Sequence, residues 1–152
     1  MADTPEVIAG LAREAQLQQL STIDSLDTKA ASLIGFAGVV LGLLFTAPVS
    51  TDHWNTALTI GASAILAAVI PLAAALLPRK YAFSPEIEAL DQFWGGAPSR
   101  EVHEVTTRSI IRALAANGDS LRFKALFVRL GVLFIVVGLL VAVAGVLYAL
   151  NR

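Results

Sequence analysis

Three long stretches of the chain contain no charged residue and are separated by polar segments. They cover residues 30–47, 57–77 and 130–150. A helix crosses a hydrocarbon core of roughly 30 Å with about 20 apolar residues, each of which adds about 1.5 Å. The second and third stretches have this length, and Lys29 can extend the shorter first one by reaching to the interface. The pattern therefore predicts three transmembrane helices.

Burial inside a soluble helical bundle is the competing interpretation of these stretches. A helix that is uncharged on every side must be covered all round, and a chain of 152 residues has too little amphipathic helix to cover three. The composition agrees with the membrane interpretation, because only 15% of the residues are charged against about a quarter in soluble domains. We predict an all-α integral membrane protein.

Lysine and arginine are distributed unequally around the predicted spans. All of them except Arg152 precede the first span or lie between the second and the third, and the loop 48–56 has none. The positive-inside rule then places residues 1–29 and 78–129 in the cytoplasm, and the loop and residues 151–152 outside it. The first residues carry no basic segment ahead of an apolar run, so we expect the first span itself to serve as the insertion signal.

The predicted cytoplasmic segments are also helical. A helix starting at Thr4 meets no strong breaker before the end of the first span, so one helix is expected to run from the cytoplasm into the membrane. After the second span we predict a short helix starting near Ser84, and a longer one from Ser99 that stops at residues 117–118. Asp119 would cap a further helix leading into the third span. Together these segments predict a small antiparallel helical bundle.

Small residues recur at intervals of three and four positions in each predicted span. Lipid provides no hydrophobic drive for helix association, so such positions are where backbones approach closely. The predicted packing positions are Ala31, Gly35, Gly38 and Gly42 in the first span, Gly61, Ala64 and Ala68 in the second, and Gly131, Gly138, Ala142 and Gly145 in the third. The pattern is compatible with packing within one protomer and with contacts in a homo-oligomer.

Chemistry-bearing residues are scarce in this sequence. No Asp, Glu, Lys, Arg or His lies inside a predicted span, which speaks against coupled transporters and proton relays. His53 and His103 fall on opposite sides of the predicted membrane, and cysteine is absent. HExxH, GxSxG and P-loop motifs do not occur either, so we expect no enzyme, no metal site and no cofactor. A net charge of −1 gives no footprint for a nucleic acid polymer.

Charged residues gather where the first and third spans are expected to leave the cytoplasm. They form a juxtamembrane collar, which we define as Asp24, Asp27, Lys29, Arg122, Lys124 and Arg129. Acidic residues beside an anionic leaflet are unfavourable unless basic partners neutralise them. The collar is interpreted either as a structural belt of salt bridges or as a hinge at which an anion competes for the basic side chains.

Three local features of the spans occur together. Residues 27–30 form a D-x-K-A sequence entering a glycine-containing span, a proline-basic turn at 78–80 follows the second span, and a basic stem at 117–129 leads into the third. In this combination the chain resembles the small transmembrane effectors of Pycsar antiphage defence. The resemblance carries over Asp27 and Lys29 by position, without a nucleotide contact for either.

This resemblance implies a multi-pass protein of the prokaryotic cytoplasmic (inner) membrane. It implies activation by a cyclic pyrimidine nucleotide, cUMP or cCMP, which a partner cyclase makes, after which the effector impairs membrane integrity and aborts infection. The alternative hypothesis is a constitutive accessory or scaffold protein of a larger membrane complex, with no ligand. An adjacent cyclase gene favours the first hypothesis and its absence favours the second.

Overall fold

Most of the chain is described by a computed structural model. The described residues are 4–46, 56–79, 81–82 and 99–151. Two parts of the predicted organisation lie outside them, namely the short helix expected near Ser84 and most of the loop that contains His53. The side chain of His103 lies outside them as well.

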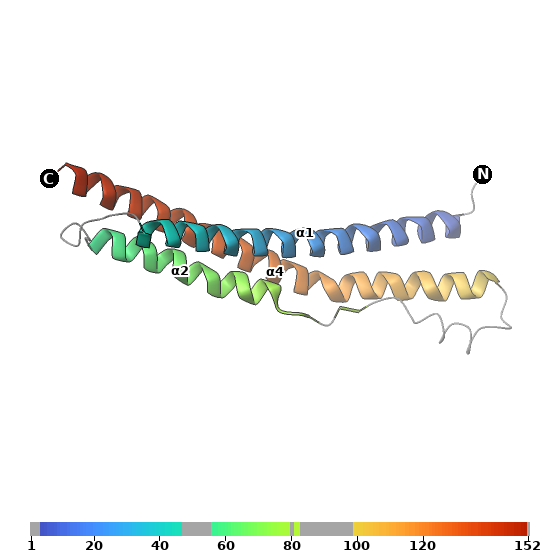
Figure 1. Ribbon diagram of the computed structural model, residues 1–152. Coiled ribbons are helices and arrows are strands. Elements are labelled where there is room, and N and C mark those ends of the chain that lie inside the picture. The colour runs from blue at the N-terminus through green and yellow to red at the C-terminus, as the bar shows by residue number, and fades with distance from the viewer. Residues whose placement is uncertain (1–3, 47–55, 80, 83–98, 152) are drawn as a thin grey trace. The chain divides into compact units, whose positions relative to one another are not determined.

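The described residues fold into three α-helices (Figure 1). These are α1 at Thr4–Thr46, α2 at Thr56–Leu76 and α4 at Ser99–Leu150. Each contains a segment long and apolar enough to cross a membrane, and no strand occurs in the described part of the chain. The all-α fold with three candidate spans is therefore confirmed.

Helix α1 is continuous, as the sequence predicts. It begins at Thr4 and ends at Thr46, two residues before Pro48, whose ring disfavours helical geometry in the residue ahead of it. Helix α2 holds Pro71 inside its span, where that residue is buried. A proline removes one backbone hydrogen bond, and transmembrane helices tolerate it because neighbouring helices can satisfy the carbonyl that is released.

Helix α4 differs from the prediction, because it passes without interruption through Asn117 and Gly118. The predicted stop there is wrong, and Asp119 therefore caps no new helix. A terminal glycine normally adopts the left-handed conformation, but no described glycine has a positive φ. The Asn117 amide bonds to another segment of the chain instead of competing for its own helix backbone, which removes the usual reason for a helix to end at asparagine.

The chain divides into two compact units. The stem unit comprises Met1–Asp24 and Pro78–Arg122, and the span unit comprises Ser25–Leu77 and Phe123–Arg152. In the stem unit the described parts of α1 and α4 run in the same direction (Figure 1), so the antiparallel arrangement expected from the sequence is absent between them. In the span unit α2 runs opposite to α1 and α4.

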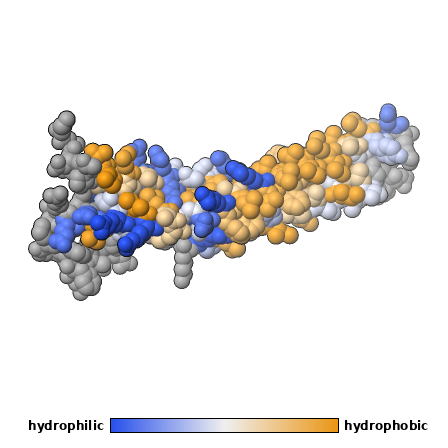
Figure 2. Space-filling model, turned by 180° about the vertical axis from the view of Figure 1, so that it is seen from behind, coloured by the Kyte–Doolittle hydropathy of each residue, from blue (hydrophilic) through white to orange (hydrophobic). Residues whose placement is uncertain are grey.

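The core of the span unit is built from all three helices. Its buried members are Ala30 and Ala37 of α1, Ile65, Ala68, Leu72 and Ala75 of α2, and Val128 and Ile135 of α4. Larger apolar side chains such as Leu43, Ile70 and Leu140 are more than 60% exposed. Figure 2 shows one face on which this hydrophobic surface is continuous over the span unit. A small-residue core with large apolar side chains on the outside is the arrangement expected of helices that pack in lipid.

The predicted small-residue positions divide into two groups. In the second and third spans Gly61, Ala68, Gly131, Gly138, Ala142 and Gly145 are buried and Ala64 is half-buried. Gly61, Gly131, Gly138 and Ala142 lie where α2 packs against α4. The four positions of α1 are exposed, and a β-carbon added at Gly35, Gly38 or Gly42 would meet nothing within 4 Å. Helix α1 packs instead through Ala30 and Ala37, which are 0% exposed. Its glycine face therefore points away from the core of this protomer.

Candidate functional site

An ion pair between Asp27 of α1 and Lys124 of α4 lies in the span unit. The distance from Oδ1 of Asp27 to Nζ of Lys124 is 2.5 Å, and the two side chains are 37% and 3% exposed. An ammonium group in a buried position requires compensation for the water that it loses, and a carboxylate at this distance supplies it. The pair also ties the D-x-K-A segment of α1 directly to the helix that forms the third span.

The structure brings together only these two members of the juxtamembrane collar. Asp24, Lys29, Arg122 and Arg129 are exposed, and no ion pair joins any of them among the described side chains. Lys29 and Arg129, which belong to the span unit, are accessible to solvent or to lipid headgroups. The collar thus consists of one ion pair, between a buried Lys124 and a half-buried Asp27, and four exposed charged side chains rather than a closed ring of salt bridges.

A second polar arrangement, which we call the amide junction, lies in the stem unit and consists of Gln19, Ala82 and Asn117. The Oδ1 atom of Asn117 accepts a hydrogen bond from the backbone N–H of Ala82 at 2.8 Å, and its Nδ2 donates to the Ala82 carbonyl at 2.9 Å. Nδ2 also donates to Oε1 of Gln19 at 3.3 Å. Gln19 in turn donates through Nε2 to the carbonyl of Leu114 at 3.3 Å.

The amide junction is buried and internally consistent. Asn117 is only 6% exposed, so its polar atoms depend on partners within the protein. Both its acceptor and its donor group have them, and the bonds connect three segments: α1, α4 and the residues that follow α2. We call this last segment the strap and define it as Pro78, Arg79, Tyr81 and Ala82, none of which is helical.

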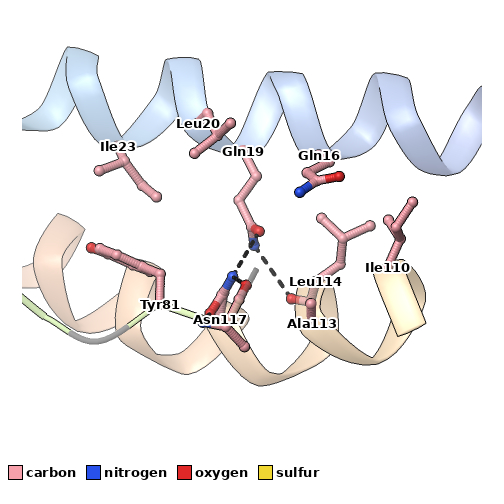
Figure 3. A pocket seen from close by; sticks show the side chains of 10 residues that line it. Gln16, Gln19, Leu20, Ile23, Tyr81, Ile110, Ala113, Leu114 and Asn117 are labelled. Atoms are coloured by element: carbon pink, nitrogen blue, oxygen red, sulfur yellow. Dashed lines mark hydrogen bonds between the residues drawn. The ribbon is translucent and has the colours of Figure 1, made fainter. Parts of the chain in front are cut away.

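A small pocket adjoins the amide junction (Figure 3). Its apolar lining consists of Leu20, Ile23, Ala82, Ile110, Ala113 and Leu114, and its polar lining consists of Gln16, Gln19, Tyr81 and Asn117. No charged side chain lines it within the described residues. Its volume is about 10 Å³, which is close to the space that one water molecule requires. In this state the pocket is too small for an organic ligand.

Metal chemistry finds no support in the described part of the chain, which contains no group of three or more His, Cys, Asp or Glu side chains placed to hold an ion. The candidate site residues that the structure adds to those expected from the sequence are the amides of Gln19 and Asn117. The sequence analysis assigned Asn117 to a helix stop and gave Gln19 no role.

Comparison with known proteins identifies the family. Residues 11–151 match the family described as the Pycsar effector protein domain. The chain is a Pycsar effector. The matched range contains the spans and most of the stem unit, so the resemblance expected from the D-x-K-A segment, the proline-basic turn and the basic stem is confirmed over nearly the whole chain. No curated protein and no solved structure matches it.

Membership of the Pycsar family makes this protein a membrane effector of antiphage defence. The three apolar helices agree with a location in the membrane. The Asp27–Lys124 pair lies in the span unit and the amide junction lies in the stem unit.

Proposed function

We propose that this Pycsar effector is activated during phage infection by a cyclic pyrimidine nucleotide, cUMP or cCMP, from a partner cyclase. The activated protein then impairs the integrity of the cytoplasmic membrane and aborts the infection. The observation that carries the proposal is the family match across residues 11–151, which covers the stem as well as the spans. The match also favours this function over a constitutive scaffold without a ligand.

The lack of charged residues in the spans supports disruption of the membrane by assembly of protomers or by rearrangement of helices. Ions cross a bilayer along polar or charged linings, and residues 30–47, 57–77 and 130–150 contain no charged side chain. A single protomer therefore has no ready-made hydrophilic path along its spans. Activation is expected to create one by changing how the helices contact each other or how protomers contact each other.

A homo-oligomer is part of this proposal. Gly35 and Gly38 are exposed on α1, where an added β-carbon would meet nothing within 4 Å, whereas Gly61, Gly131 and Gly138 pack closely against the neighbouring helix of the same protomer. A face of small residues allows close approach of a second helix in lipid. We propose that this face contacts a second copy of the chain, with the N-terminus in the cytoplasm and the C-terminus outside it.

A bacterial infection experiment tests the proposed function. Cells carry the effector together with a gene for a pyrimidine nucleotide cyclase, and membrane potential and phage yield are followed after infection. We expect depolarisation before lysis and a reduced phage yield. The matched control carries the effector with an inactivated cyclase, and it should keep its potential and support normal phage growth.

Two outcomes would contradict the proposal. Unchanged potential and unchanged phage yield in the presence of an active cyclase would remove the defence mechanism described above. Equal depolarisation with active and inactive cyclase would show that the membrane effect does not need the nucleotide signal.

A further inference from the structure

The contact between Asn117 and Ala82 has an unusual form for a side chain inside a long helix. Both hydrogen-bonding groups of one residue, the N–H and the C=O of Ala82, bond to the two ends of one side-chain amide, at 2.8 and 2.9 Å. The strap therefore presents to Asn117 a neighbouring donor and acceptor that lie on the same side. The amide pairs with that edge through two hydrogen bonds at once.

A nucleobase edge offers the same pair of groups. Asparagine and glutamine amides recognise bases through bidentate hydrogen bonds to an adjacent donor and acceptor. Uracil provides the ring N–H beside a carbonyl, and cytosine provides the exocyclic amino group beside a ring nitrogen. Either edge can replace the Ala82 peptide at Asn117, because a side-chain amide presents one acceptor and one donor in either orientation.

We propose that the amide of Asn117, supported by Gln19, is the receptor for the donor–acceptor edge of a pyrimidine base, and that the Ala82 peptide occupies it in the ligand-free state. The identity of the ligand rests on the proposed function. The position of the site rests on the amide junction and on the pocket that adjoins it (Figure 3).

The lining of the pocket fits a base better than a phosphate. Apolar contact surface is provided by residues such as Leu20, Ile23 and Leu114, and no charged side chain lines the pocket among the described residues. A buried amide that has lost its partner leaves unsatisfied polar groups, so release of the strap is unfavourable unless the ligand replaces both of its bonds. The site thereby selects ligands with the matching edge.

The size of the pocket couples binding to movement of the strap. A volume of about 10 Å³ admits a water molecule but no base, so a base enters only when Ala82 leaves. Ligand binding and strap release are then the same event, and the ligand shifts the protein toward the released state. Because the strap follows directly on α2, which ends at Leu76, its release frees the cytoplasmic end of the second span from its attachment to Asn117.

A spin-labelling experiment on the full chain in lipid nanodiscs tests this mechanism. The natural chain contains no cysteine, so Ala82→Cys, at an exposed position, gives a single labelling site on the strap. With cUMP or cCMP as the probe we expect the label to become mobile relative to the same preparation without nucleotide. Binding is measured in parallel by calorimetry on the same preparation.

Substitutions in the amide junction provide the decisive comparison. Asn117→Leu should make the label mobile without nucleotide and weaken nucleotide binding by about tenfold or more, because both hydrogen bonds to the base are lost. Gln19→Leu, a milder change for the case in which Asn117→Leu does not fold, should weaken binding by a smaller factor. Gln18→Leu is the matched control, since Gln18 is the neighbouring exposed glutamine and its side chain takes no part in the junction.

The outcomes separate this proposal from the proposed function. Equal nucleotide affinity in the natural chain and in Asn117→Leu, or binding that leaves the label immobile, would overturn the receptor role of Asn117. Absence of cUMP and cCMP binding would also overturn it. The infection experiment then decides the broader question, because a cyclase-dependent depolarisation would leave the proposed function standing with its ligand site elsewhere.

Discussion

The carbonyl oxygen of Gly138 on α4 lies 2.7 Å from the position that a β-carbon on Gly61 of α2 would take. The contact is reciprocal, because a β-carbon on Gly138 would lie 2.8 Å from the carbonyl oxygen of Gly61 and 2.6 Å from Cγ1 of Ile65. Real β-carbons do not approach other atoms so closely. The two helices therefore meet backbone to backbone, and this crossing requires glycine on both sides.

Alanine at position 61 should destabilise the protein. The added methyl group meets the backbone of α4 as well as the β-carbon of Ala142, and backbone atoms cannot turn away as a flexible side chain can. We expect a loss of about 1–3 kcal/mol in the free energy of unfolding, the usual range for overpacking. Denaturant unfolding in detergent micelles, followed by circular dichroism, measures it.

Gly38→Ala is the matched control for that substitution. It introduces the same methyl group in the same kind of helix, but at a position with nothing within 4 Å. Its unfolding free energy should stay unchanged or rise slightly, because alanine favours the helix over glycine. Equal destabilisation by both substitutions would show that the crossing of α2 and α4 does not determine the effect, because helix propensity alone would stabilise both variants.

Removal of the Asp27 carboxylate should destabilise the protein more than removal of the Lys124 ammonium group. Asp27→Ala takes the carboxylate away from an ammonium group that is 3% exposed, whereas Lys124→Met leaves a carboxylate that is 37% exposed and partly hydrated. We expect Asp27→Ala to lower the free energy of unfolding by about 2 kcal/mol, which is less than the roughly 3–5 kcal/mol lost when a fully buried pair is broken. Lys124→Met should lower it by a smaller amount.

A double variant checks the explanation of that asymmetry. Asp27→Ala combined with Lys124→Met removes both charges, so most of the stability lost in Asp27→Ala should return. The same unfolding measurement is applied to the natural chain, the two single variants and the double variant. Additive losses would mean that the two side chains stabilise the protein independently and that their pairing is without consequence.

The pair of Glu104 and Arg108 provides the contrasting case. Its atoms approach to 2.6 Å, but the side chains are 60% and 69% exposed and stand four positions apart on one helix. Water screens such pairs, so Glu104→Gln should change the unfolding free energy by no more than about 0.5 kcal/mol. A loss comparable to that of Asp27→Ala would contradict the view that burial, not distance, decides the importance of an ion pair here.

Orientation in the membrane can be measured with single cysteines, since the natural chain has none. Gln18→Cys and Asn151→Cys replace exposed residues. In intact spheroplasts a membrane-impermeant maleimide should label position 151 and reach position 18 only after lysis, as the distribution of basic residues predicts. Labelling of position 18 alone in intact cells would reverse the predicted topology.

The sequence was most informative about the helices that lipid requires. The predicted second span at 57–77 differs by only one residue at each end from α2 at Thr56–Leu76. The agreement is close because an uncharged run of this length in lipid must form a helix to satisfy its backbone hydrogen bonds. It was misleading at residues 117–118, where asparagine and glycine are a frequent helix end. The Asn-Gly pair is a local signal for a helix end. Here the helix continues, and the side chain of Asn117 forms hydrogen bonds with Ala82, which is 35 residues away in the sequence.

The candidate sites could be predicted only in part, for a similar reason. Opposite charges at matching positions before two spans pointed toward a contact such as that of Asp27 with Lys124. Neutral amides carry no charge that would indicate a partner, and nothing in the sequence around Gln19 or Asn117 indicates that the two side chains are hydrogen-bonded. Likewise, the first span contains small residues on several faces, so its composition alone could not decide that Ala30 and Ala37, rather than Gly35 and Gly38, pack in the core.

The close crossing of α2 and α4 has a consequence for the proposed disruption of the membrane. Two helices in backbone contact leave no width for a water molecule between them, and neither can slide without lifting away from its partner. We therefore expect α2 and α4 to move as one rigid body. The proposed disruption of the membrane then requires α1 to move relative to this pair, which it contacts through Ala30, Ala37 and partly buried side chains such as Leu33.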